Sequence, residues 1–196
     1  MDFPIRDAQP EDADAISTLV QAAFDAHVAD DWEAEGVQTF RTETRPERLR
    51  ERLRSATYGA IAESDSGLIG VVLFTRPSWL ALMFVHPACA RRGVGRGLWE
   101  AARAYLRASH PDVHTVELNA SPYAVAFYRA LGFAPISREF LLGGSRATRM
   151  ACWLRARELG AELEVAGEGA AAAGASGATT QREEREPMFH KAEDAT

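Results

Sequence analysis

The chain has 196 residues, 46% of them hydrophobic, and a formal net charge of −6 at pH 7. This length suits one domain with an appendage better than two domains. The longest strongly apolar run, residues 79–85, is too short to span a bilayer, and the charged N-terminus MDFPIRDAQPED lacks the apolar centre of a signal peptide. We therefore expect a cytoplasmic protein without a membrane partner.

The charge is distributed unevenly along the chain. Residues 157–196 hold four basic and nine acidic residues, a net of −5, which leaves −1 for residues 1–156. The stretch GEGAAAAGASGATTQREERE has no apolar face to bury. We expect one domain over residues 1–156 and an acidic, Ala/Gly-rich disordered tail over residues 157–196. In that tail, Met188 and Phe189 are either a short docking element or part of a free C-terminus.

The pattern of apolar residues predicts a domain of mixed α and β structure, with alternation in some segments and helical spacing in others. In chain order we expect a strand at 3–6, a helix from Pro10 to about Phe24, helices at 34–40 and 46–55, strands at 58–63, 68–74 and 80–85, a helix at 94–108, a strand at 114–118, a helix from Ser121 to Leu131, and strands at 133–140 and 148–154. Gly132 suits the C-cap of the last helix.

The segment ARRGVGRGL, residues 90–98, lies between a buried strand and a helix. The free N–H groups of a helix's first turn bind anions, and glycine at 93 and 95 removes Cβ atoms that would block a phosphate. Neither the P-loop pattern nor the GxGxxG pattern is present. The alternative is that the glycines only permit close packing of helix on strand.

In this context, FVHPACARRGVGRGLWEAA resembles the coenzyme-A-binding motif of the GCN5-related N-acetyltransferase (GNAT) superfamily. The family pattern is Gln or Arg, two variable residues, Gly, a variable residue, and Gly or Ala. It falls on residues 90–95, where Ala90 replaces the usual Gln or Arg. A second frame starts at Arg92 but lies less well relative to the strand.

A second motif, ELNASPYAVAFYRALGF, resembles the family's later strand and helix, which end in a tyrosine followed by Gly-Phe. Here these residues are Tyr128, Gly132 and Phe133. Many members have asparagine seven residues before the tyrosine, where this chain has Ser121, with Asn119 two residues earlier. The resemblance covers about residues 3–155 and is closest to a bacterial subgroup of undefined substrate.

The resemblance implies an α/β (mixed α+β) GNAT fold. Such a fold has a central, mostly antiparallel twisted sheet of 6–7 strands that splays between the fourth and fifth strands, flanked by about four helices. It also implies an acyltransferase that moves an acetyl group from acetyl-CoA, its cosubstrate, to an amine by direct attack, without a metal. The two cysteines, Cys89 and Cys152, form no metal-type pair or disulfide framework.

The resemblance also implies roles for particular residues. Tyr128 would be the general acid that protonates the leaving thiolate, because a phenol keeps its proton at neutral pH. A backbone N–H near Val85 would stabilise the oxyanion. The residues implied in coenzyme A binding are Phe84, Val85, Arg91, Arg92, Gly93, Val94, Gly95, Arg96, Asn119 and Ser121.

The general base and the acceptor stay open. Candidate bases are Glu63, His86, Glu117 and His27. The acidic stretch HVADDWEAEGVQTF, with Asp30, Asp31, Glu33 and Glu35, is either a rim that attracts a cationic amine or a solvated helix start. Trp32 and Trp79 are either pocket walls or core residues.

The acceptor class is a small-molecule amine or a protein amino group. The alternatives are a non-catalytic acyl-CoA-binding or regulatory protein on the same fold, and a nucleic-acid module that uses the three arginines. The near-neutral domain argues against nucleic acid as a partner. The oligomeric state stays open, although homodimers are frequent in the family.

Overall fold

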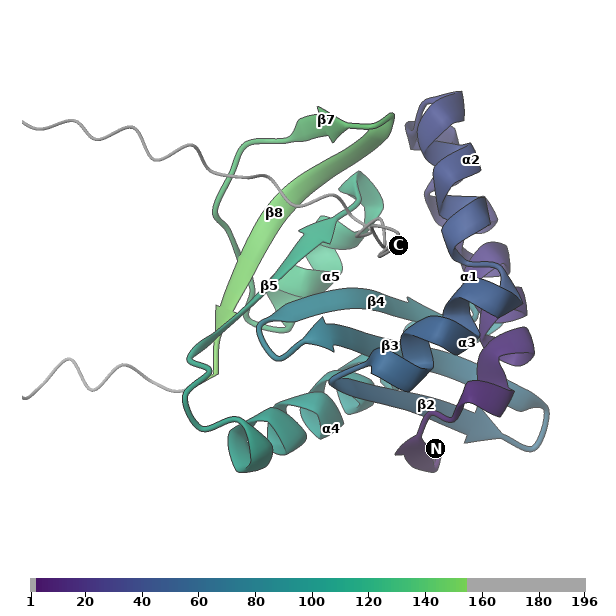
Figure 1. Cartoon of the computed structure of the whole chain (residues 1–196). Coiled ribbons are helices and arrows are strands. Elements are labelled where there is room, and N and C mark those ends of the chain that lie inside the picture. The colour runs from purple at the N-terminus through teal and green to yellow at the C-terminus, as the bar shows by residue number, and fades with distance from the viewer. Residues whose placement is uncertain (1–2, 155–196) are drawn as a thin grey trace, which may run out of the picture.

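The computed structural model describes residues 3–154, which form one sheet with helices on both faces (Figure 1). The predicted tail at residues 157–196 and its Met188–Phe189 element lie outside the described residues. The described part contains no helix long and apolar enough to cross a membrane.

The sheet has eight strands in the order β1-β2-β3-β4-β5-β8-β6, with β7 paired to β8. Their bounds are β1 Ile5–Asp7, β2 Tyr58–Ser64, β3 Gly67–Arg76, β4 Trp79–Val85, β5 Thr115–Ala120, β6 Ala134–Pro135, β7 Phe140–Leu142 and β8 Ser145–Trp153. All neighbours are antiparallel except β4 and β5, which are parallel. The expectation of a mostly antiparallel sheet that splays between the fourth and fifth strands is confirmed.

The helices lie close to their predicted positions. They are α1 Ala13–His27, α2 Ala34–Glu43, α3 Pro46–Ser55, α4 Val94–Ser109 and α5 Val125–Ala130, with 3-10 turns at Pro10–Asp12 (η1), Ala29–Asp31 (η2), Pro87–Cys89 (η3) and Pro122–Ala124 (η4). The helix expected from Ser121 begins as the η4 turn, and Gly132 follows its end at φ +95°, the left-handed position that glycine favours.

One prediction about the C-terminal strands is wrong. Residues 133–140 do not form a continuous strand, because backbone pairing to β8 ends with the bond from the Ile136 amide to the Arg149 carbonyl at 2.9 Å and resumes only at Phe140. At the break, the hydroxyl oxygen of Ser137 accepts a hydrogen bond from the backbone N–H of Arg149 at 3.0 Å, where a strand carbonyl would otherwise pair. The split explains why the sheet has eight strands rather than six or seven.

The two faces of the sheet bury separate apolar cores. On one face, α4 packs against β2 and β3, and its Val94, Leu98 and Trp99 share a buried cluster with Val116 of β5. On the other face, Ile16 and Phe24 of α1 pack with Phe40 of α2. The strand β4 contributes to both cores, since Leu80 belongs to the first and Leu82 to the second. The sheet therefore separates one apolar core on the α4 side from a second apolar core on the α1 side.

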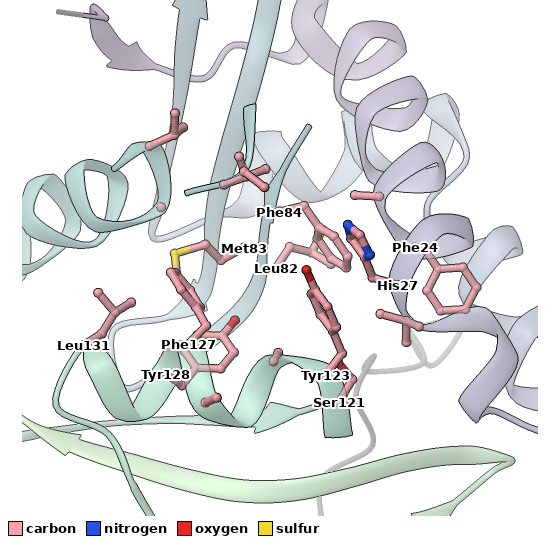
Figure 2. A pocket seen from close by; sticks show the side chains of 18 of the residues that line it. Phe24, His27, Leu82, Met83, Phe84, Ser121, Tyr123, Phe127, Tyr128 and Leu131 are labelled. Atoms are coloured by element: carbon pink, nitrogen blue, oxygen red, sulfur yellow. The ribbon is translucent and has the colours of Figure 1, made fainter. Parts of the chain in front are cut away.

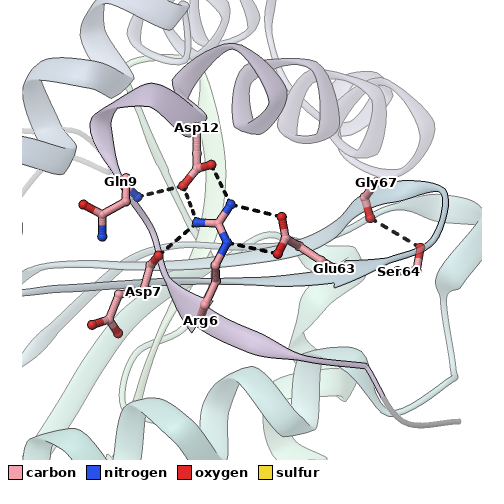
Figure 3. A network of polar contacts seen from close by, with 7 residues as sticks. All are labelled: Arg6, Asp7, Gln9, Asp12, Glu63, Ser64 and Gly67. Atoms are coloured by element: carbon pink, nitrogen blue, oxygen red, sulfur yellow. Dashed lines mark hydrogen bonds and ion pairs between the residues drawn. The ribbon is translucent and has the colours of Figure 1, made fainter.

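A polar network fastens the first strand to the rest of the sheet (Figure 3). The guanidinium of Arg6 on β1 donates to both carboxylate oxygens of Asp12 at 2.8 Å and to both of Glu63 on β2 at 3.0 Å. Asp12 also accepts from the backbone N–H of Gln9 at 2.7 Å. Arg6 thereby joins β1, η1 and β2 at the start of α1.

Candidate active site

The gap in the sheet lies between β4 and β5. These strands meet at one residue pair, Trp79 with Glu117, and at a bond from the Glu117 amide to the Ser78 carbonyl at 2.8 Å. Beyond that pair the two strands separate, while β5 stays paired with β8 on its other edge from Thr115 to Ala120. Among the described residues, the rest of β4 therefore has no strand on this edge. A gap of this kind leaves main-chain N–H and C=O groups available to a ligand.

The hydrogen bonds of β4 show which amides face the gap. The amide of His86, just past the strand, donates to the Ile69 carbonyl on β3 at 2.9 Å. Successive amides of a strand point to opposite edges. The N–H of Val85 is therefore directed away from β3, toward the gap, as an oxyanion donor at this position requires.

The turn before α4 has an unusual backbone. Arg91 adopts φ +62° and Gly93 adopts φ +85°, and these left-handed residues precede the first turn of the helix. The first bond into the helix runs from the Gly97 amide to the Gly93 carbonyl at 2.9 Å. The amides of residues 94–96 precede that bond and have no intrahelical partner, so they form a candidate anion site at the positive end of the helix dipole.

Gly95 permits a close approach of α5 to α4. A Cβ at this position would lie 2.7 Å from Cζ of Phe127 and 3.5 Å from the side chain of Val85. The glycine therefore has a packing role as well as exposing its amide, so the two interpretations of the glycine segment do not exclude each other.

The arginines of this segment are placed differently from one another. Arg91 and Arg96 line the cavity described below, whereas Arg92 does not. A nitrogen of the Arg96 guanidinium lies 3.5 Å from the Ala130 carbonyl at the end of α5. The structure thus brings two positive side chains to the anion site.

A cavity of about 540 Å³ begins at this turn, passes the open edge of β4 and reaches α1 (Figure 2). Every predicted site residue other than Arg92 lines it: Phe84, Val85, Arg91, Gly93, Val94, Gly95, Arg96, Asn119, Ser121 and Tyr128. This volume lies within the range of small-molecule sites.

Tyr128 is one of the residues that line this cavity. Its side chain comes from α5 and is only 6% exposed (Figure 2). Burial raises the pKa of the phenol above its ordinary value, because a phenolate would lose its hydration there. The hydroxyl is therefore protonated throughout the neutral range and can act as a proton donor.

Of the four candidate bases, one lines the cavity and three do not. His27, near the end of α1, lines the cavity and stacks on Tyr123 with ring centroids 4.4 Å apart. Glu63 is paired with Arg6 at the far end of β2, and Nδ1 of His86 accepts a hydrogen bond from the Ala88 amide at 3.2 Å. Glu117 lies 3.8 Å from Arg149 and does not line the cavity.

The acidic stretch after α1 does not form the cavity wall. Asp30, Asp31, Glu33 and Glu35 are all exposed and absent from the lining. Trp32, in the same stretch, does line the cavity. Trp79 instead packs under the guanidinium of Arg149, which lies 5.2 Å from its ring centroid.

Several lining residues had no sequence signal that marked them as functional. Phe24 and Phe40 lie at ordinary core positions of α1 and α2, and Tyr123 and Phe127 both precede the motif tyrosine. The helical spacing of apolar residues identified Phe24 as buried, but nothing in that spacing indicates a cavity beside it. No group of three or more His, Cys, Asp or Glu that could hold a metal occurs among residues 3–154.

Comparison with known proteins agrees with this architecture. Residues 28–154 match the model of the acetyltransferase (GNAT) domain. The curated protein peptidyl-lysine N-acetyltransferase YiaC of Escherichia coli is 35% identical over 71 residues, which are 36% of this chain and 46% of YiaC. The match therefore spans less than half the length of that relative.

Solved structures resemble the whole described domain. A GCN5-related N-acetyltransferase from Rhodopseudomonas palustris has a TM-score of 0.66 at 20% identity, covering 78% of this chain and 96% of its own. The PaiA N-acetyltransferase of Thermoplasma acidophilum, in complex with coenzyme A, has a TM-score of 0.65 at 17% identity, covering 78% and 99%. At these identities the likeness shows the fold.

Proposed function

The chain belongs to the GNAT acetyltransferase family, and we propose that it transfers an acetyl group from acetyl-CoA to a primary amine. The observation that carries this proposal is the course of the cavity. It connects an anion site at the start of α4 with the buried hydroxyl of Tyr128, along the open edge of β4.

The residues at the α4 end fit the pyrophosphate of coenzyme A. Three amides, at residues 94–96, converge with the side chains of Arg91 and Arg96 on one small region. An anion bound there exchanges hydration for fixed N–H donors and opposite charge. We expect the backbone to provide most of the binding and the arginines to add to it, with Arg92 outside the contact.

The open edge of β4 fits the pantetheine arm. An extended group with amides can pair with an unpaired strand edge as an added strand does. The edge at Phe84 and Val85 offers such groups, while Asn119 and Ser121 line the facing side of the cavity. Asn119 is itself held by the guanidinium of Arg149, whose Nε lies 3.4 Å from its side-chain oxygen.

Acetyl-CoA supplies an activated acyl group as a thioester. In the proposed reaction, the N–H of Val85 stabilises negative charge on the carbonyl oxygen while the amine nitrogen forms its bond to the acetyl carbon. As the carbon–sulfur bond breaks, the Tyr128 hydroxyl donates its proton to the departing sulfur. His27, the one candidate base that lines the cavity, accepts the proton that the amine loses, directly or through water.

Replacing Tyr128 with phenylalanine tests the chemical role. Tyr128→Phe removes the hydroxyl and keeps the buried ring, so acetyl-CoA binding should be unchanged. The rate of thiol release at saturating amine should fall about 100-fold, the usual contribution of a general acid. Tyr58→Phe, which removes a phenol hydroxyl from β2 outside the cavity lining, serves as the matched control. An unchanged rate in Tyr128→Phe would remove the tyrosine from the reaction.

The second candidate is a non-catalytic acyl-CoA-binding or regulatory protein on this fold. It shares the anion site with the enzyme but needs no proton donor at the end of the cavity. Thermal unfolding with acetyl-CoA, followed by thiol release from a panel of amines, separates the two. Stabilisation by acetyl-CoA without turnover of any amine would favour the binding protein, and no stabilisation would contradict both.

A further inference from the structure

The two ends of the cavity differ in chemistry. The end at α4 carries Arg91 and Arg96, whereas the end at α1 is aromatic and apolar. We define the acceptor lobe as the lining residues of that second end: Phe24, His27, Val28, Trp32, Phe40, Leu82, Phe84 and Tyr123. If the α4 end takes the coenzyme, this lobe is the part of the cavity left for the acceptor.

The floor of the acceptor lobe is a packed aromatic cluster. Phe24 and Phe40 stack with ring centroids 3.9 Å apart and planes at 13°. Trp32 meets Phe24 edge-on at 5.2 Å, and its indole N–H donates to the Arg146 carbonyl at 3.2 Å. Phe84 of β4 joins the cluster at 5.8 Å from Phe40. These rings come from α1, α2, β4 and the segment between the two helices. Contacts among four segments of the chain therefore fix the positions of the rings in the floor.

The mouth of the lobe is spanned by a second pair of rings. His27 of α1 and Tyr123 of η4 are parallel within 4° at 4.4 Å, although Tyr123 is 56% exposed (Figure 2). The pair joins the helix on one side of the gap to the turn on the other side. Both rings line the cavity together with Phe84.

The charge of the lining limits which acceptors fit. No aspartate or glutamate is among the described residues that line the cavity, and its two arginines lie at the other end. A polycationic amine would lose hydration at each charge without gaining a carboxylate partner. An apolar or aromatic body, by contrast, gains free energy by leaving water and by stacking on the lobe's rings.

We propose that the acceptor is a small primary amine borne on an aromatic body, as in an arylalkylamine, and that the His27–Tyr123 pair and Phe84 select it. The inference rests on the proposed acetyl transfer and names its substrate class. The amine nitrogen lies toward Tyr128 and the open edge of β4, and the aryl group occupies the acceptor lobe. The bond changes are those of the proposed reaction: nitrogen–carbon forms, carbon–sulfur breaks, and His27 takes the amine proton.

The first experiment compares amines on the full chain. Thiol release gives kcat/KM for 2-phenylethylamine, ethylamine, 1,4-diaminobutane and a lysine-containing peptide, and calorimetry gives the affinity of each for the protein saturated with coenzyme A. We expect both kcat/KM and affinity to be about ten-fold or more higher for 2-phenylethylamine than for each other amine. That difference is the effect of burying one aromatic ring. Equal or better binding of the diamine or the peptide would overturn the inference.

The second experiment changes the lobe without touching its floor. Tyr123→Asp adds a carboxylate at the mouth and removes one stacked ring. It should lower the affinity for 2-phenylethylamine by about five-fold, and it should reduce the ratio of that affinity to the affinity for 1,4-diaminobutane. Leu141→Asp makes a comparable change at an exposed position of β7 outside the cavity and should leave the preference unchanged. If Tyr123→Asp has the same preference as the unaltered chain, the assigned selectivity is wrong.

The readouts keep the two proposals distinguishable. Failure of acetyl-CoA to bind would contradict the proposed function. Binding of acetyl-CoA together with turnover of polycationic amines alone would leave the function standing and overturn the aromatic acceptor. Because calorimetry measures amine binding without turnover, absent binding of 2-phenylethylamine counts against the inference even where no thiol is released.

Discussion

Among single residues, Arg91 and Gly93 show that the proposed anion site is built from the backbone as well as from charged side chains. The left-handed conformations of Arg91 and Gly93 orient the turn so that α4 begins with its amides facing the cavity. Non-glycine residues rarely adopt positive φ, and the conformation of Arg91 is therefore a cost that the surrounding structure offsets. Such local strain is frequent where a backbone must approach a ligand.

Ala90 gives a prediction at the same scale. It is exposed at the rim of the cavity, at the motif position where glutamine or arginine is usual in the family. Ala90→Gln should tighten acetyl-CoA binding by about three-fold, because one added hydrogen bond to the ligand is worth that much. Titration calorimetry measures the change, with Ala88→Gln, exposed and outside the lining, as the control. Weaker binding would show that the motif frame beginning at Arg92 is the correct one.

At the scale of elements, α2 and the β7–β8 hairpin are fitted to each other. The hairpin turns through Gly143 and Gly144, both at positive φ, and the Gly144 carbonyl accepts from the Glu33 amide at 2.9 Å. A Cβ on Gly36 would lie 2.5 Å from the Gly144 carbonyl carbon. The two backbones touch here, and the contact holds Trp32 at the edge of the acceptor lobe.

Gly36→Ala should push α2 away from the β7–β8 hairpin. The added methyl meets main chain that cannot rotate away, so we expect a loss of about 1–3 kcal/mol in the free energy of unfolding. Denaturant unfolding measures it, and Gln38→Ala, exposed on the same helix, should change stability little. If Gly36→Ala were as stable as the unaltered chain, the close approach of α2 to the hairpin would be wrong.

The Arg6 network makes the first strand's attachment dependent on pH. The hydrogen bond from Arg6 holds the pKa of the Asp12 carboxyl below its ordinary value. A carboxyl whose pKa is lower in the folded state stabilises the fold above its ordinary pKa, near pH 4, and this contribution is lost as the pH falls below that range.

We predict that the free energy of unfolding depends on pH differently in Asp12→Asn and in the unaltered chain. Asp12→Asn should be less stable than the unaltered chain at neutral pH, and the two should converge as the pH falls toward about 2. Asp65→Asn, in the exposed turn between β2 and β3, should follow the unaltered chain throughout. A constant difference at all pH values would show that Asp12 acts through packing instead of charge.

At the scale of the whole molecule, every described element belongs to one folded unit. The eight strands share one sheet, and the two apolar cores lie on its opposite faces within residues 3–154. The acidic surplus lies beyond them in the sequence, since residues 157–196 carry −5 of the net −6. We therefore keep the proposal that residues 1–156 form the catalytic domain.

A shortened chain tests that proposal. A protein of residues 1–156 should unfold at the same temperature as the full chain, and acetyl-CoA should stabilise both equally, because the sheet, the cores and the cavity are all retained. Differential scanning calorimetry measures both quantities. A lower unfolding temperature for the shortened chain would show that residues after 156 pack on the domain.

Much of this architecture could be predicted because it depends on local physics. Apolar spacing located α1, α3, α4 and the strands β2–β4 to within a few residues, since a helix and a strand bury faces of different period. Glycines marked the start of α4 and the end of α5, because positive φ at Gly93 and Gly132 is costly for other residues. Ser137, whose hydroxyl interrupts the C-terminal strand, carried no such signal.

The order of elements, the family and the position of the proposed anion site could be inferred from the sequence, because each depends on residues adjacent in the chain. The rest of the candidate site became visible in the folded chain. Of the four candidate bases it places only His27 in the cavity lining, it leaves the acidic residues Asp30 to Glu35 outside that lining, and it brings Phe24, Phe40 and Phe84 together in one lobe. The reason is physical: a cavity's charge and shape arise where distant segments meet, and each of those segments alone looks like an ordinary piece of core.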